Sequence, residues 1–317
     1  MRIVCLLAAN VAFAGAFSPL SAPLARTPTN SCVLLRATAD SAIADLASAQ
    51  AASVDKIAAA IGPDLECKPE LSWATGTVAG SAATIDGREA PGANGNVAWL
   101  ANACVASKTS SLTIFNGPLT DVPHLLSRAS VSSGGSHLRF TLDFRPRAYG
   151  AYELVNADGT YPGPETFGRD SFTYSGNRKE FDTKFGTDEV ASFVQSLPSQ
   201  LEDAVVLGGE ANELDLLTRG PLFLDVACPL TDGNVAAIAA ARTQAADYWL
   251  GWAMDQSHAH RPGAPVNSQY VYDTKYRQNA YGGLLAQYSA DFGPEDGAAF
   301  AAAESGPLDE AYVGGGS

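Results

Sequence analysis

One alternating stretch, Leu138–Phe144, and the residues just after it carry the side chains best suited to chemistry. Every second residue of this stretch is apolar, and a period of two predicts a strand with one buried face. The intervening positions are polar or charged: Arg139, Thr141, Asp143 and Arg145, followed by Arg147. A carboxylate and several guanidinium groups on one sheet surface can receive an anionic ligand. The alternative is a surface that simply faces water.

His124 is a second candidate for chemistry, because it lies between Pro123 and the apolar residues Leu125 and Leu126. An imidazole titrates near neutral pH, so a histidine in a central sheet can donate protons in catalysis. The alternative is a histidine that is only hydrogen-bonded within the sheet. The sequence leaves both interpretations open.

A third group combines aromatic rings with charges on a predicted helix near the C-terminus. Its members are Tyr270, Tyr272, Asp273, Lys275, Tyr276, Arg277 and Tyr281. Rings supply contact area for a large, flat ligand, and Lys or Arg side chains bind its carboxylates. The alternative is a surface helix whose long side chains lie along it.

Other kinds of site have little support in the sequence. His258 and His260 follow a predicted helix near Asp255, and their spacing favours a solvated helix end over a metal site. There is no GxGxxG pattern after a strand, no P-loop, no HExxH and no GxSxG motif, so nucleotide cofactors, metalloprotease chemistry and hydrolase triads are not indicated. The five cysteines lack CxxC spacing, which disfavours a disulfide framework, a zinc site and an iron–sulfur site.

Composition limits the class of protein further. The chain has 317 residues, 46% of them hydrophobic, and a formal net charge of −14. So acidic a chain is not expected to bind nucleic acid or anionic lipid non-specifically. No run of about 18 apolar residues follows the N-terminus, so we expect no membrane span.

The N-terminal residues predict targeting rather than structure. Residues 1–16 have the features of a signal peptide: Arg2, the apolar run Ile3–Phe13 and an Ala14-Gly15-Ala16 cleavage site. Residues 17–38 are rich in Ser, Thr, Pro and Ala and lack acids, as is typical of a transit peptide. Together they resemble the bipartite presequence of a complex plastid, which places the protein in the chloroplast stroma. Plain secretion is the alternative, and the sparse, unpaired cysteines favour a reducing compartment.

The elements that must position the candidate residues follow from periodicity. Helices are predicted at Asp40–Ile61, Thr187–Leu197 (ended by Pro198), Asp232–Gln256, Val266–Tyr288 (weakened by Gly282-Gly283) and Pro294–Ala303. Strands are predicted within Leu71–Asp86 and at Val97–Ala106, Leu112–Phe115, Pro123–Val131, Leu138–Phe144 and Pro221–Cys228, with a long loop at Tyr149–Phe185. The close succession of strands indicates an antiparallel meander. We expect a single domain at 39–305 and a disordered tail at 306–317.

The chain resembles a known family in four pieces that keep their order and spacing. These pieces are WLANACVASKTSSLTIFNGPLTDVPHLLSRASV, LRFTLDFRPR, AAIAAARTQAADYWLGWAMDQ and YDTKYRQNAYGGLLAQYSADFG. They resemble red chlorophyll catabolite reductases, which are relatives of the ferredoxin-dependent bilin reductases. The resemblance implies an α/β fold, a three-layer α/β/α sandwich with a central antiparallel sheet. It further implies a linear tetrapyrrole substrate between the sheet and the C-terminal helices, no bound cofactor, and electrons from reduced ferredoxin.

The resemblance gives the candidate residues expected roles in chlorophyll catabolism. His124, Asp143 and Asp273 are the candidate proton donors. The candidate substrate-binding residues are Arg128, Arg145, Arg147, Tyr276 and Arg277. A basic patch for ferredoxin is expected from Arg169, Arg178, Lys179 and Lys184.

The sequence departs from the family at two positions. A glutamate that contributes to the family's pocket falls at Arg128 here, and a second acid would fall near Gly283-Leu284, where there is no carboxylate. A tetrapyrrole carrier of the same fold, without reductase activity, is therefore the alternative function. The sequence leaves open whether the protein forms a homodimer.

Overall fold

The structure is a computed structural model. It describes residues 38–68, 73–89, 97–117, 120–132, 134–147, 178–207, 219–258 and 266–306. These residues lie in the compact unit Leu35–Ser317. Within the described part of the chain, no helix is both long and apolar enough to cross a membrane.

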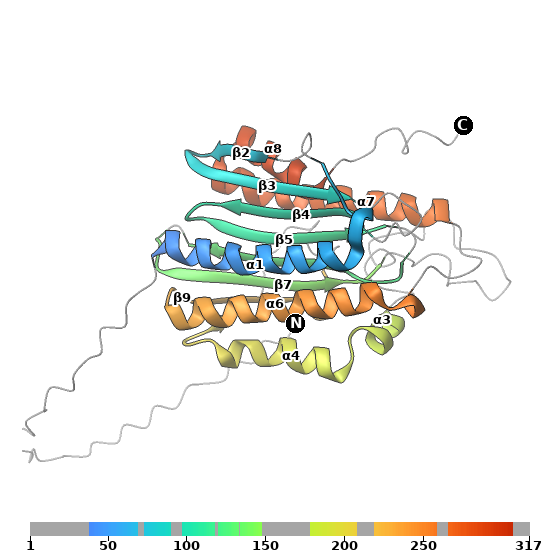
Figure 1. Cartoon of the computed structure of the whole chain (residues 1–317). Coiled ribbons are helices and arrows are strands. Elements are labelled where there is room, and N and C mark those ends of the chain that lie inside the picture. Colours follow the sequence, from blue (N-terminus) through green and yellow to red (C-terminus); the bar gives the residue numbers. More distant parts are fainter. Residues whose placement is uncertain are drawn as a thin grey trace, which may run out of the picture. The chain divides into compact units, whose positions relative to one another are not determined.

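A nine-stranded antiparallel sheet is formed by the described strands (Figure 1). The strands are β1 (Glu66–Cys67), β2 (Trp73–Val78), β3 (Ser81–Glu89), β4 (Val97–Val105), β5 (Thr109–Asn116), β6 (His124–Val131), β7 (His137–Arg145), β8 (Val205–Val206) and β9 (Leu224–Pro229). Their order is β1-β3-β4-β5-β6-β7-β9-β8, and β2 also pairs with β3. Strands β3 to β7 are sequential neighbours, so the predicted meander is confirmed.

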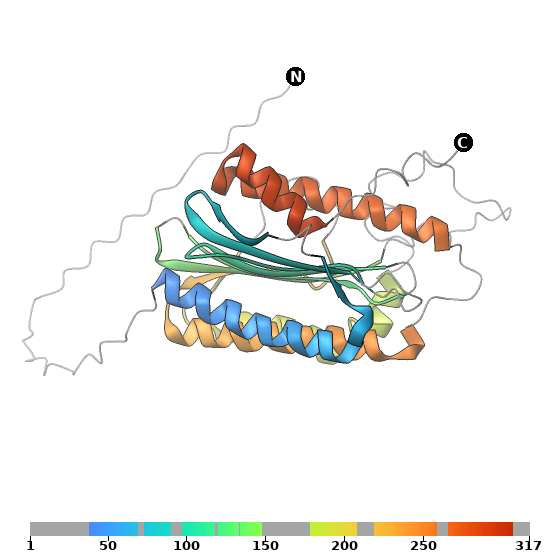
Figure 2. The same ribbon diagram turned by 45° about the horizontal axis from the view of Figure 1, so that its top comes forward.

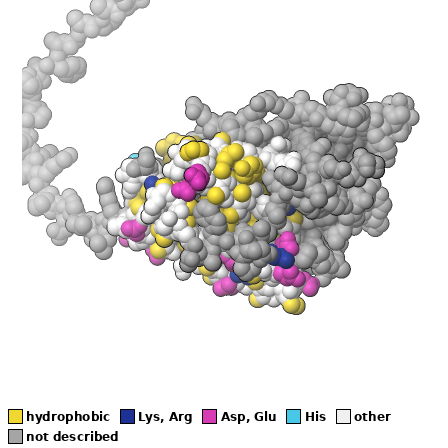
Figure 3. Space-filling view, turned by 90° about the horizontal axis from the view of Figure 1, so that it is seen from above, with side chains coloured by type: hydrophobic (Ala, Val, Ile, Leu, Met, Phe, Trp, Pro, Cys, Tyr) yellow, Lys and Arg dark blue, Asp and Glu magenta, His cyan; other side chains and the backbone are white. Residues whose placement is uncertain are grey.

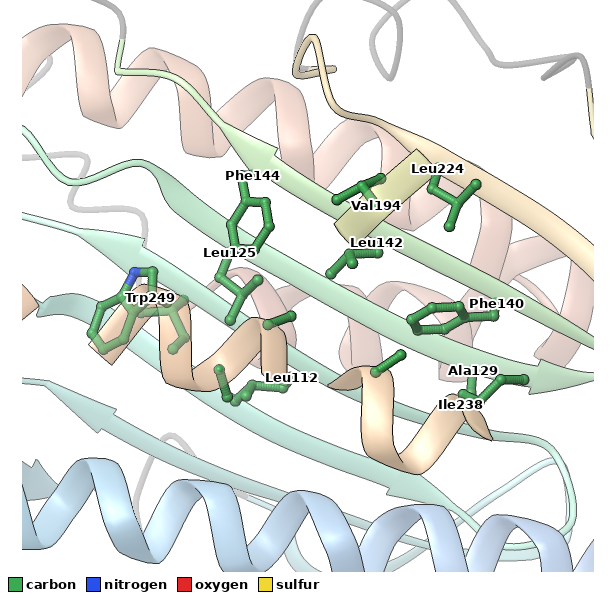
Figure 4. Packing of buried hydrophobic residues seen from close by; sticks show 14 of the residues in the cluster. Leu112, Leu125, Ala129, Phe140, Leu142, Phe144, Val194, Leu224, Ile238 and Trp249 are labelled. Atoms are coloured by element: carbon green, nitrogen blue, oxygen red, sulfur yellow. The ribbon is translucent and has the colours of Figure 1, made fainter. Parts of the chain in front are cut away.

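Helices α1 (Ala39–Ile61), α4 (Asp188–Gln200) and α6 (Asp232–Met254) share one hydrophobic cluster with one face of this sheet (Figure 2). The apolar side of β7 belongs to this cluster: Leu138, Phe140, Leu142 and Phe144 are all buried in it. Figure 4 shows Phe140, Leu142 and Phe144 in the same cluster as Trp249 and Ile238 of α6. The alternation predicted for β7 is therefore confirmed.

Helices α7 (Val266–Phe292) and α8 (Pro294–Ser305) lie on the opposite face (Figure 2). Their apolar side chains, including Tyr288 and Phe300, form a second buried cluster with Trp99 and Phe115 of the sheet. The two helices pack closely at Gly297, where an added Cβ would lie 2.6 Å from the Ser289 main-chain nitrogen. The predicted α/β class with a central antiparallel sheet is thus confirmed.

Several predicted boundaries are wrong, and packing explains two of them directly. The loop prediction fails at its C-terminal end, where helix α3 (Arg178–Lys184) buries Phe181 in the core. Helix α4 continues through Pro198 to Gln200, because a proline in the last turn removes only one intrahelical hydrogen bond while Leu197 stays buried. The strand predicted from Pro221 begins only at Leu224.

Helix α7 is likewise longer than predicted. It runs through Gly282-Gly283 and ends at Phe292. The buried side chains of Leu284, Tyr288 and Phe292 anchor this half of the helix on the sheet. Such packing offsets the low helix propensity of two adjacent glycines.

Candidate functional site

Strands β6 and β7 bring most of the predicted site residues onto one face of the sheet. His124 lies directly opposite Arg145 in the register, Leu126 opposite Asp143, and Arg128 opposite Thr141. Residues that are directly opposite on neighbouring strands point to the same side of a sheet. Because the apolar residues of β7 face α6, these polar residues face α7 and α8.

His124 is almost completely buried, with 1% of its surface exposed. The main-chain N–H of Asn116 donates to its Nδ1 (2.9 Å). Its Nε2 has no hydrogen-bond partner among the residues that the structure describes. The ring lies 4.8 Å from the ring of Tyr276 and 5.6 Å from that of Phe115, centroid to centroid. Since buried polar atoms in folded proteins are nearly always hydrogen-bonded, this Nε2 is a candidate to meet a ligand.

The surroundings of His124 favour a neutral ring. Burial lowers its pKa well below the usual value, and the guanidinium groups of Arg147, Arg145 and Arg277 lower it further. Desolvation and neighbouring positive charges both oppose a second proton on the imidazole.

Asp143 is completely buried beside Arg145 and Gly220. Its carboxylate accepts a hydrogen bond from Arg145 Nε (2.9 Å) and others from the Gly220 N–H, which lies 3.1 Å from each carboxylate oxygen. A Cβ at position 220 would lie only 2.3 Å from the Phe144 carbonyl oxygen and 2.4 Å from Asp143 Oδ1. Only glycine fits there, and this close approach holds the carboxylate in place.

Arg147 connects this part of the sheet to α7. Its Nη2 donates to Asp273 Oδ2 (2.5 Å) and to the Gly117 carbonyl oxygen (2.8 Å). On the same helix, Arg277 donates from Nε and Nη2 to the Ser305 carbonyl oxygen at 3.2 and 3.1 Å. Asp273 and Tyr276 are buried. We refer to these neighbouring residues as the His124 cluster: His124, Asp143, Arg145, Arg147, Asp273, Tyr276 and Arg277.

Arg128 lies outside this cluster and binds a different set of partners. Its Nη2 donates to Glu304 Oε1 (2.8 Å) and its Nη1 to Gln287 Oε1 (2.6 Å). The Thr113 hydroxyl donates to the same Glu304 oxygen (2.8 Å), and the Tyr288 hydroxyl donates to Oε2. We call these five residues the Arg128 cluster. The guanidinium expected to anchor a substrate is thus neutralised by a carboxylate of this chain.

The charge state of the Arg128 cluster follows from these contacts. Burial raises the pKa of Glu304, but Arg128 and the hydrogen bonds from Tyr288 and Thr113 outweigh burial, so the pKa lies below its usual value. Sequence reasoning missed Glu304 and Gly220. The available signal for Glu304 was an acid at the end of the Ala-rich run after Phe300, whereas nothing local distinguishes Gly220.

Several other predicted groups are not assembled by the described residues. His258 Nε2 lies 3.8 Å from Asp255 Oδ2, and His260 is outside the described residues. Within those residues, no group of three or more His, Cys, Asp or Glu side chains is placed to hold a metal ion. The side chains of Tyr270, Tyr272 and Lys275 are outside the described part.

The expected basic patch for ferredoxin is only partly described. Lys184 Nζ donates to Asp121 Oδ2 (3.1 Å). Arg169 and the side chains of Arg178 and Lys179 lie outside the described residues. On the face seen in Figure 3, the described Lys and Arg side chains show only as small separate spots beside Asp and Glu.

The comparisons with known proteins find similarity in structure and none in sequence. No family model matches the chain, and no curated protein matches it in sequence. Among solved structures, the chain is similar to phytochromobilin synthase from tomato in complex with biliverdin. The identity is 12%, the TM-score is 0.52, and the match covers 78% of each chain. The two proteins therefore share a fold, at an identity too low for residue roles to be transferred.

Proposed function

We propose that the chain is a ferredoxin-dependent reductase of a linear tetrapyrrole, either a bilin or red chlorophyll catabolite. The buried His124 cluster carries this proposal, because it lies on a sheet whose fold resembles that of a bilin reductase crystallised with biliverdin. The cluster offers what a linear tetrapyrrole needs. Tyr276 provides ring surface, Arg145 and Arg147 provide positive charge near carboxylates, and His124 provides an unpartnered nitrogen.

The reaction adds two electrons and two protons across one double bond of the tetrapyrrole, which becomes a single bond. Two reduced ferredoxins are oxidised, because each delivers one electron. The first electron creates a radical anion, which the guanidinium groups of Arg145, Arg147 and Arg277 stabilise electrostatically. The candidates for the proton source are water and the side chains of His124, Asp143 and Asp273.

Two further expectations belong to this proposal. The first is the three-layer sandwich, which is supported by the helices on both faces of the sheet (Figure 2). The second is the plastid stroma as the place of action, which is supported by the composition of residues 1–38. Stromal ferredoxin would then be the electron donor.

A tetrapyrrole carrier is the second candidate function, and one observation favours it. The resemblance implies a pocket glutamate where this chain has Arg128, and Arg128 is bound to Glu304 and Gln287. A protein that keeps the fold and loses a pocket acid can bind a tetrapyrrole without reducing it.

The experiment that separates these functions uses the full chain with biliverdin and red chlorophyll catabolite. Each pigment is titrated into the protein and its absorbance spectrum is recorded, first alone and then with photoreduced ferredoxin under anaerobic conditions. The reductase proposal predicts a spectral shift on binding and then loss of the starting pigment only when ferredoxin is reduced. The product should contain one double bond fewer than the starting pigment. Mass spectrometry should show that it is heavier by two hydrogens.

Two other results decide against the reductase. A spectral shift without turnover of either pigment identifies a carrier. No shift with either pigment contradicts both functions. The variant His137→Gln is the matched control, because this histidine is exposed on β7 and lies outside the cluster.

A further inference from the structure

The most informative atom of the site is His124 Nε2, and the partner of Nδ1 determines its state. A main-chain N–H can only donate a hydrogen bond, so the Nδ1 that accepts from Asn116 must carry a lone pair. The single proton of a neutral imidazole is then on Nε2. The ring is held in this orientation because the Asn116 side chain donates to the carbonyl oxygens of Val122 (2.7 Å) and Pro123 (2.8 Å), immediately before His124.

A second proton on this ring meets two obstacles. It would have to bind at Nδ1, where it would face the Asn116 N–H and break that hydrogen bond. It would also create a cation near three guanidinium groups, those of the buried Arg145 and Arg147 and of the half-buried Arg277 on α7. The cluster's carboxylates are engaged elsewhere, since Asp143 binds Arg145 and Asp273 binds Arg147.

We infer that His124 is a neutral hydrogen-bond donor, whose Nε2–H binds an oxygen acceptor of the tetrapyrrole, and that it is not the proton source of the reduction. This inference rests on the proposed function for the identity of the ligand. It narrows the candidate proton donors to Asp143, Asp273 and water. A neutral ring that gave up its Nε2 proton would become an imidazolate anion, so this proton orients and polarises the ligand and is not transferred.

The first test concerns the ligand-free protein and is independent of any activity. Nitrogen-15 NMR of the full chain, labelled at histidine, distinguishes a protonated ring nitrogen from one with a lone pair. The signals of His124 are identified by their loss in His124→Gln. We expect one protonated and one unprotonated nitrogen, unchanged from about pH 8 to about pH 5. Two protonated nitrogens near neutral pH would overturn the inference.

The second test uses two substitutions and biliverdin as the probe. His124→Gln places an amide N–H near the position of Nε2 and cannot act as an acid, whereas His124→Leu removes the donor. We expect His124→Gln to bind biliverdin within about threefold of the wild type and His124→Leu to bind about tenfold more weakly. Circular dichroism of both variants confirms folding.

The turnover of these variants gives the decisive contrast. His124→Gln should keep most of the ferredoxin-dependent turnover, because the donor is retained. If His124→Gln binds biliverdin normally and loses turnover as completely as His124→Leu does, the histidine supplies a proton and the inference is wrong. If the wild type binds no tetrapyrrole, the proposed function fails, and the NMR experiment still decides the protonation state of His124.

Discussion

Strand β6 presents two buried polar side chains to helices α7 and α8, His124 at its start and Arg128 further along. Arg128 is neutralised by Glu304, whose two oxygens also accept hydrogen bonds from Thr113 and Tyr288. His124, by contrast, has one nitrogen held by the main chain and the other without a partner in the described residues. Burial and charge therefore do not identify a ligand site by themselves. At His124 the unsatisfied Nε2 is one further sign of a ligand site.

The opposite face of the sheet supports the same lesson. Arg242 of α6 is buried against Ser110 and Ser127, and burial lowers its pKa to about 9. Each of its guanidinium nitrogens nevertheless donates to an oxygen, on Ser110, Ser127 or the Leu46 main chain. This arginine connects α6 to the sheet and to α1. Its role is structural, because its hydrogen bonds are satisfied within the protein.

The largest expected effect comes from breaking the Arg128 cluster. Arg128→Met leaves the carboxylate of Glu304, which has no exposed surface, without its cation. We expect the free energy of unfolding at neutral pH to fall by about 3–5 kcal/mol, measured by urea denaturation. The loss should shrink as the pH is lowered, because Glu304 then becomes protonated and neutral.

The matched control for this prediction is the double variant Arg128→Met with Glu304→Gln, which removes both charges. It should recover most of the lost stability. If the single variant loses less than about 1 kcal/mol of unfolding free energy, Arg128 and Glu304 behave like an exposed ion pair. The cluster would then be open to solvent.

The next largest effect concerns Asp143, a candidate proton donor of the His124 cluster. Asp143→Asn keeps the shape of the side chain and removes its acid. We expect ferredoxin-dependent turnover to fall about 100-fold or more, while biliverdin still binds. Single-turnover absorbance measurements separate the two quantities. Unchanged turnover would exclude Asp143 as the proton source and leave Asp273 and water.

Gly220→Ala tests whether Gly220 holds the carboxylate of Asp143 in place, and its expected effect is moderate. The added methyl group overlaps the Phe144 carbonyl oxygen and Asp143 Oδ1, so the main chain or Asp143 must move. We expect a loss of about 1–3 kcal/mol in unfolding free energy and weaker biliverdin binding. Gly251→Ala is the control, because this position of α6 is exposed, nothing lies within 4 Å of a Cβ there, and alanine favours a helix. Equal stability of both variants would contradict the packing at Gly220.

The smallest effect is a pH dependence of stability that His124 creates. Its pKa is lowered in the folded state, so the unfolded chain binds more protons once the pH falls below the unfolded pKa of about 6.5. The wild type should lose stability relative to His124→Gln as the pH falls, by at most about 1.4 kcal/mol per pH unit. Urea denaturation at about pH 7 and about pH 5 measures this difference. If the unfolding free energies of the two proteins changed equally between these pH values, the histidine would titrate in the folded protein as it does in water.

Much of the fold was predictable from residue patterns. The alternation of β7, the continuous apolar run of β4 and the three- and four-residue spacing of α6 correspond to the observed elements, since each pattern reports which side of an element is buried. The fold is similar to that of tomato phytochromobilin synthase, and this likeness concerns the fold alone. The roles of the site residues remain predictions.

What the sequence determined by itself was local: where strands and helices form, and that His124, Asp143, Arg145 and Arg147 lie on or beside two adjacent strands. Only the tertiary structure decided which of these side chains has a partner within the protein. The pairing of Arg128 with Glu304 joins residues 176 positions apart, and Gly220 reaches Asp143 across 77 positions. Local periodicity carries no information on such contacts, because they depend on how α8 and the segment before β9 pack on the sheet.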